Sequence, residues 1–159
     1  MAGQGGADKT TERAADSAAA QTAQGNAAPI SEQLDRLSVA TIETALDLLE
    51  AGDELPVMLA ADCSEQLYLF SDDTPDGCYR AGCEQVAALG ADCTRYVLLY
   101  DGVVQEDEAG ASVAALLFEF AERGMAHAWS GCLPYERDEG GGVRTGELFA
   151  GGEERLLFA

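Results

Sequence analysis

The chain has very few cationic side chains. Its 159 residues include 9 lysines and arginines against 29 aspartates and glutamates, and the formal net charge at pH 7 is -20. Proteins that bind nucleic acid need clustered cations that face the phosphates, whereas here Lys9 and the arginines are scattered along the sequence. We therefore expect no direct binding to nucleic acid, and no adhesion to an anionic membrane surface.

Long apolar runs are also missing. No stretch approaches the roughly 18 apolar residues of a membrane helix. Residues 1–28 are mostly alanine, glycine, glutamine and threonine, with Met1 as their only large apolar side chain. Because such a segment cannot bury enough surface to offset the entropy of ordering, it is predicted to be a disordered, low-complexity tail. It also lacks the apolar stretch of a secretion signal, which predicts a cytoplasmic protein. The remaining residues, 29–159, are enough for a single domain.

Side chains that could carry chemistry are few. There is one histidine, His127, and the cysteines number five. Without a secretion signal, these cysteines are expected to be free thiols that pack as small hydrophobic side chains. A zinc site is not predicted, because cysteine and histidine residues five apart point away from each other in a helix or a strand. No phosphate or nucleotide motif is present, so we expect neither a metal ion nor a cofactor.

His127 and Cys132 are the candidates for a catalytic pair. A cysteine nucleophile usually needs a histidine partner, and these two residues lie close in sequence, beside the only tryptophan, Trp129. In a strand, however, residues five apart lie on opposite faces. The pattern therefore places His127 with Trp129 on one face and Cys132 on the other, in a strand that follows a turn at Arg123–Gly124.

Two helices are predicted from apolar spacing and from end signals. Residues 32–50 carry apolar side chains at helical intervals, with Ser31 as the N-cap and Gly52 just beyond the end. A second helix is predicted from residue 75 to about residue 89, with Thr74 as its N-cap and a proline at its first position.

Most of the remaining chain is predicted to form strands. Runs rich in leucine, valine and aromatic residues indicate strands at 54–62, 65–71 and 93–105. Asp101 and Gly102 match a two-residue hairpin turn within the last of these runs. A closing hairpin is predicted around Gly151 and Gly152.

Residues 111–123 are compatible with two structures. Their alanines favour a helix. As a strand, they would place Leu117, Glu119 and Ala121 on one face. A helix that ended at Arg123 would leave almost no loop before the next strand, and this favours the strand. The chain as a whole thus predicts one α+β domain, in which two helices pack on a largely antiparallel sheet of meanders and hairpins.

The excess of acidic residues has three explanations. It can keep a protein soluble and monomeric, it can reflect adaptation to a salty cytoplasm, or it can attract a partner with a basic surface. Because no nucleophile, base and orienting group converge, we predict a non-catalytic interaction module: an adaptor, inhibitor or immunity-type protein. The alternative is an enzyme that uses His127 with a cysteine or a carboxylate. The candidate binding residues are Trp129, Tyr135, Glu106, Asp107 and Glu108.

Overall fold

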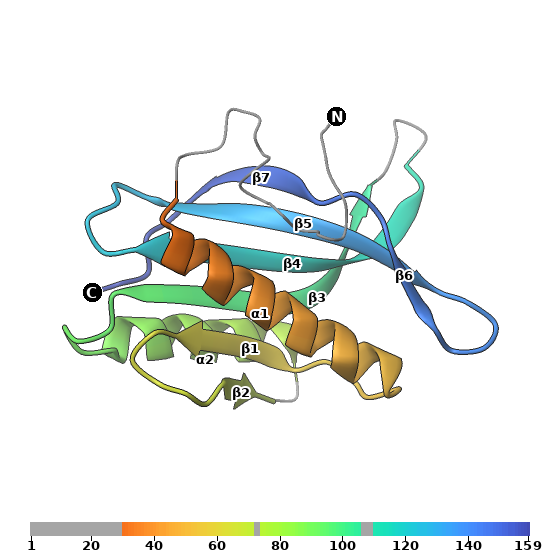
Figure 1. Cartoon of the computed structure of the whole chain (residues 1–159), viewed down its shortest axis with the longest axis horizontal. Coiled ribbons are helices and arrows are strands. Elements are labelled where there is room, and N and C mark those ends of the chain that lie inside the picture. The colour runs from red at the N-terminus through yellow and green to blue at the C-terminus, as the bar shows by residue number, and fades with distance from the viewer. Residues whose placement is uncertain (1–29, 72–73, 106–109) are drawn as a thin grey trace.

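An antiparallel sheet with one helix on each side makes up the described chain (Figure 1). The computed structural model describes residues 30–71, 74–105 and 110–159, so the predicted tail lies outside the described residues. The elements are α1 (Glu32–Glu50), β1 (Val57–Ala61), β2 (Tyr68–Phe70), α2 (Pro75–Ala88), β3 (Arg95–Gln105), β4 (Ser112–Glu122), β5 (Ala128–Arg137), β6 (Val143–Thr145) and β7 (Phe149–Glu154). The predicted α+β class is confirmed. None of the described helices is long and apolar enough to cross a membrane.

The strands run in the order β2-β1-β3-β4-β5, and β5 pairs along its outer edge with both β6 and β7. The longest contact is the β3–β4 pair, which runs without interruption from Arg95 opposite Glu122 to Gln105 opposite Ser112. Because side chains alternate along a strand, this register decides which residues face each helix.

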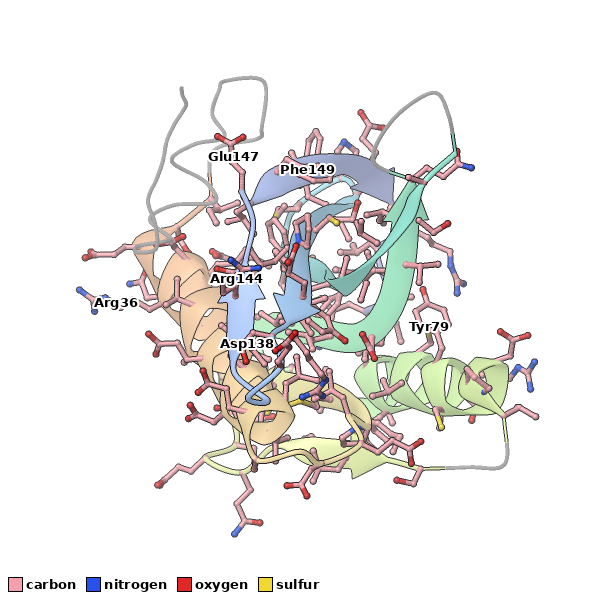
Figure 2. The ribbon with its side chains drawn as sticks, turned by 90° about the vertical axis from the view of Figure 1, so that its right-hand side faces the viewer. Arg36, Tyr79, Asp138, Arg144, Glu147 and Phe149 are labelled. Carbon is pink, nitrogen blue, oxygen red and sulfur yellow. A yellow bond between two sulfur atoms is a disulfide. The ribbon has the colours of Figure 1, made fainter. Side chains whose placement is uncertain are left out.

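The two faces of the sheet are named here after the helix that covers each (Figure 2). On the α1 face, Leu99 and Phe118 are opposite each other and pack with Leu34 and Ala45 of the helix. On the α2 face, Leu98 is opposite Glu119, and Val86 of α2 packs in the same cluster as Leu98. The sheet is therefore buried on both sides near its centre.

Both predicted helix starts are confirmed. The Ser31 hydroxyl accepts a hydrogen bond from the Leu34 N–H at 3.1 Å, and the Thr74 hydroxyl accepts one from the Gly77 N–H at 3.0 Å. These side chains satisfy backbone donors that have no partner inside the helix. The strand prediction for residues 111–123 is also confirmed, since most of this segment forms β4.

The hairpin turn predicted at Asp101–Gly102 is wrong. β3 continues through both residues and stays paired with β4. The Tyr135 hydroxyl donates a hydrogen bond to Asp101 at 2.7 Å, and a Cβ on residue 102 would lie 2.7 Å from the Leu117 side chain. Residue 102 is a glycine inside a strand because the Leu117 side chain fills the volume that a Cβ would occupy.

The hairpin predicted around Gly151 and Gly152 is also wrong. Both glycines lie inside β7, which pairs with β5 across a register shift at Ser130/Gly131. The Ser130 side chain occupies the space that a side chain at residue 151 would need. Close approach to a neighbouring strand, not a turn, explains this glycine.

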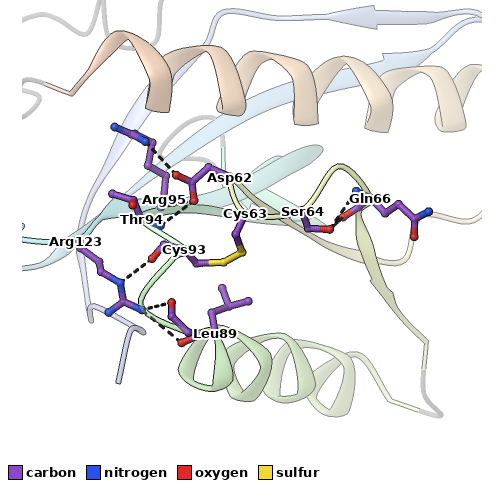
Figure 3. The surroundings of a disulfide bond; sticks show 10 residues. Asp62, Cys63, Ser64, Gln66, Leu89, Cys93, Thr94, Arg95 and Arg123 are labelled. Carbon is purple, nitrogen blue, oxygen red and sulfur yellow. Dashed lines mark hydrogen bonds and ion pairs between the residues drawn. A yellow bond between two sulfur atoms is a disulfide. The ribbon is translucent and has the colours of Figure 1, made fainter.

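A disulfide between Cys63 and Cys93 corrects the prediction of five free thiols. Cys63 follows β1 and Cys93 precedes β3, and since these strands are neighbours, the two Cα atoms lie 4.8 Å apart. Arg123 donates to the Cys93 carbonyl oxygen at 2.7 Å and so fixes the same loop (Figure 3). The pairing depends on sheet topology, which the spacing of the cysteines does not reveal. The free cysteines are Cys78, Cys83 and Cys132.

Replacing Gly131 by alanine is expected to lower the free energy of unfolding by about 1–3 kcal/mol. A Cβ at this position would lie 2.5 to 3.2 Å from three atoms of the Phe118 ring. Urea unfolding measures the change. Gly140→Ala is the matched control, because its Cβ would meet only Asp138 at 3.6 Å. A Gly131→Ala variant as stable as wild type would show that the ring does not fill this space.

Removing the disulfide by the double substitution Cys63→Ala/Cys93→Ala is expected to destabilise the fold by about 3 kcal/mol. The bond closes a loop with a sequence separation of 30, and opening it gives the unfolded chain more conformational freedom. Urea unfolding of the variant and of the reduced wild type should give the same loss. If only the reduced wild type loses stability, the effect belongs to the reductant and not to the bond.

Candidate functional site

The structure places His127 and Cys132 on different faces of the sheet. Cys132 is opposite Leu117, on the α2 face. The His127 ring instead contacts Trp129, with ring centroids 4.7 Å apart, and Trp129 is opposite Phe120 on the α1 face. The two candidate catalytic residues therefore do not form a pair.

The surroundings of these two residues are also unlike a nucleophile and its base. The His127 Nδ1 lies 3.1 Å from the Ala128 carbonyl oxygen, and Nε2 lies 3.5 Å from a carboxylate oxygen of Glu153, whose side chain is two-thirds exposed. Burial raises the pKa of the Cys132 thiol to about 11. This thiol is therefore protonated at neutral pH and is a poor nucleophile.

The predicted binding residues are in three different situations. Trp129 is half-buried and packs against the cluster beneath α1. Tyr135 is buried in that cluster, and its hydroxyl is held by Asp101. Glu106, Asp107 and Glu108 lie outside the described residues. Of these two described candidates, only Trp129 has a side chain that a partner could contact, and only over part of its surface.

A polar cluster that the sequence did not single out lies on the α2 face. Glu119 of β4 is only 4% exposed, and its Oε2 accepts hydrogen bonds from the Tyr79 hydroxyl of α2 at 2.7 Å and the Tyr100 hydroxyl of β3 at 3.0 Å. The two tyrosine rings meet edge to face, with centroids 5.3 Å apart. In Figure 2, Tyr79 lies between α2 and the sheet. We call these three residues the Glu119 cluster.

Burial dominates the electrostatics of this cluster. Desolvation raises the pKa of Glu119, and the hydrogen bonds from the two tyrosines act in the opposite direction, as does the charge of Arg155. Desolvation and the nearby carboxylate raise the pKa of both tyrosines. Their hydroxyls therefore stay protonated and act as donors. Burial likewise raises the pKa of the neighbouring Cys83 thiol.

Among the described residues, one carboxylate oxygen of Glu119 has no hydrogen-bond partner. Both tyrosines bind Oε2, and Oε1 makes no hydrogen bond to any residue that the structure describes. Among the described residues, the fully buried side-chain atoms without a hydrogen bond do not include Oε1. This oxygen therefore retains some contact with solvent. The cluster thus presents a single acceptor atom at the end of a largely buried side chain.

This geometry suits binding better than catalysis. A recessed carboxylate can accept a hydrogen bond or face a cation, but the thiols on this face have raised pKa values and no activated nucleophile adjoins it. Across the described ranges, no three or more histidine, cysteine, aspartate or glutamate side chains are grouped so as to hold a metal ion. A scan against protein-family models, a search of curated proteins and a search of solved structures each found no match.

The sequence contained one signal for this cluster. The strand alternation places Glu119 between Leu117 and Ala121 on one face, and a glutamate is rarely buried unless it is paired. The tyrosines could not be assigned to it, because they are 40 and 19 residues away and come from other elements.

The substitution Glu119→Gln is expected to make the protein more stable at pH 7. The amide oxygen can still accept both tyrosine hydrogen bonds, and the cost of ionising a buried carboxyl disappears. Because the folded-state pKa is raised, the wild type has its full stability below the ordinary glutamate pKa and loses part of it as the pH rises through the raised value.

Urea unfolding at several pH values measures this difference. The gap between variant and wild type should be largest at neutral pH and should shrink towards pH 4. Glu84→Gln, which removes an exposed charge from α2, is the matched control and should show a much smaller gap. A Glu119→Gln variant that is less stable than wild type at pH 7 would mean that the charge itself holds α2 in place.

Proposed function

We propose that this chain is a non-catalytic interaction module that binds a protein partner with a basic surface. The observation that carries the proposal is the outer surface of α1, where Glu43, Asp47 and Glu50 are all exposed and lie three or four residues apart. We call these three residues the α1 stripe. The helix offers only one cation, Arg36, and that side chain already pairs with Glu32 at 2.6 Å (Figure 2).

The α1 stripe is not explained by helix stability. The last turn of α1 has no basic residue, although cations are favoured at the C-terminal end of a helix dipole and anions are disfavoured. Arg137 from β5 supplies the cation at this end, by donating to the Leu49 carbonyl oxygen at 2.7 Å. Asp47 and Glu50, on the outer side of the last turn, therefore remain unneutralised where the helix dipole disfavours them, and Glu43 extends the same row of acids. Recognition of a basic partner accounts for this arrangement.

The alternative function, an enzyme that uses His127 with a carboxylate, has the Glu153 contact as its support. Glu153 belongs to β7 and His127 directly precedes β5, and no described nucleophile completes the set that catalysis requires. The interaction module explains more of the surface.

The cytoplasmic location predicted from the sequence stays part of the proposal. One observation counts against it, because reducing compartments usually keep thiols reduced and the Cys63–Cys93 pair is oxidised.

Neutralising the α1 stripe with Glu43→Gln/Asp47→Asn/Glu50→Gln is expected to reduce partner binding by at least about tenfold. The immobilised full-length chain is incubated with an extract of its native host, and the retained proteins are quantified. Retention by the wild type should fall steeply as salt rises from about 0.05 to 0.5 M, since exposed charges are then screened.

The control variant is Glu65→Gln/Glu84→Gln/Asp92→Asn, which removes three exposed acids elsewhere. It should retain the partner almost as well as wild type, and both variants should unfold at or above the wild-type temperature. If the two triple variants behave alike, the acidity serves solubility and not recognition.

A further inference from the structure

The α2 face of the sheet is covered over only part of its area. α2 contacts β1, β2 and β3, and the C-terminal segment covers Tyr96, whose hydroxyl accepts a hydrogen bond from the Leu157 N–H at 3.2 Å. The far halves of β3, β4 and β5 carry no described helix on this face. Ala115 and Cys132 are buried there, one apolar side chain is 47% exposed, and the others are half-buried. We call the half-buried and exposed side chains the open patch: Tyr100, Val104, Val113, Leu117, Pro134 and Phe149.

The strand register places Glu119 at the inner border of the open patch. Leu117, two residues before it on the same face, is opposite Tyr100 on one side and Cys132 on the other, and Cys132 is opposite Phe149. The free Oε1 of Glu119 therefore borders an apolar surface. Within the described chain, no cation forms an ion pair with this carboxylate, whose partners are the two tyrosines.

Three possible occupants do not fit this surface. A second copy of the chain would bring another net charge of -20 and would be repelled. Residues 1–28 offer Met1 as their only large apolar side chain. Anionic lipid or phosphate would meet a carboxylate and a strongly negative protein. A long, thin cationic side chain fits, because its aliphatic stem matches the apolar patch and its charged end can reach a recessed carboxylate.

We propose that the open patch is a second contact surface, on which a protein partner inserts a lysine or arginine side chain towards Oε1 of Glu119. The stem packs against Leu117 and Tyr100, and the cation forms a charge-assisted hydrogen bond with Oε1 while the tyrosines hold Oε2. The inference rests on the proposed function, because it assumes a partner that is basic. The α1 stripe alone would attract a partner only by general charge. Glu119 adds one specific acceptor atom.

The first arm of the test uses n-butylammonium, which reproduces the lysine side chain, and n-butanol, its neutral analogue. Binding to the full-length protein is followed by the NMR signals of the Tyr79 and Tyr100 rings. Wild type and Glu84→Gln should bind n-butylammonium saturably, and Glu119→Gln should bind it at least about tenfold more weakly. Equal weakening in Glu119→Gln and Glu84→Gln, or equal binding of n-butanol, overturns the proposal.

The second arm separates a partner side chain from a free amine. The partner retained by the wild-type chain is offered to Glu119→Gln and to Phe149→Ser, which changes an exposed residue. Loss of at least about tenfold in both variants, with retention by Glu84→Gln, supports a protein partner. Full retention by both variants overturns the proposal even if n-butylammonium binds, while loss of the partner only in the α1 stripe variant leaves the proposed function intact.

Discussion

The uninterrupted pairing of β3 with β4 is the constraint on which the rest of the structure depends. Side chains alternate with a period of two, so a slip of one residue would exchange the two faces along the whole ladder. Such a slip would bring Glu119 beneath α1, where most buried side chains are apolar and the hydroxyls of Ser38 and Thr41 already donate to carbonyl oxygens of the helix. Steric fits favour the observed registers: Leu117 lies over Gly102 in the β3–β4 pair, and the Phe118 ring lies over Gly131 in the neighbouring β4–β5 pair. The glycines thus define the pairing without forming turns.

The register gives the two faces different chemistry. The α1 face is mainly apolar: the buried hydroxyls of Ser38 and Thr41 bond to carbonyl oxygens of α1 itself, and the Tyr135–Asp101 hydrogen bond ties two strands of the sheet together. The α2 face is built around a carboxylate, and α2 has only two fully buried residues, Gly82 and Val86. Tyr79 therefore contributes much of the specific attachment of this helix. The disulfide and Arg123 hold its C-terminal side, because Arg123 also donates to the carbonyl oxygens of Leu89 and Gly90 (Figure 3). The apolar contacts of α2 gather around Val86, so the helix covers only part of this face.

Local features of the fold could be predicted from the sequence, and features set by distant neighbours could not. Ser31 and Thr74 predict the starts of their helices, because an N-cap side chain bonds to a backbone N–H only three residues further along the chain. Asp101–Gly102 has the composition of a turn, yet it lies within a strand, since its conformation is decided by Leu117 and Tyr135. The same limit applies to the site. Alternation alone separates His127 from Cys132, whereas the Glu119 cluster joins α2, β3 and β4 and has no continuous motif.

The structure shows where several of the few cationic side chains bind. Arg95 pairs with Asp62 and Glu122, Arg123 binds carbonyl oxygens, and Arg137 binds the end of α1. These arginines stabilise junctions between elements of the fold, so they are not spread over the outer surface. Two exposed arginines, Arg36 and Arg144, already pair with glutamates, so a basic partner meets a strongly negative net field. At Glu119 the same scarcity has a local consequence, because an incoming lysine or arginine displaces no ion pair. The free-energy cost of removing water from that cation is offset by the carboxylate, which two tyrosines already hold in place.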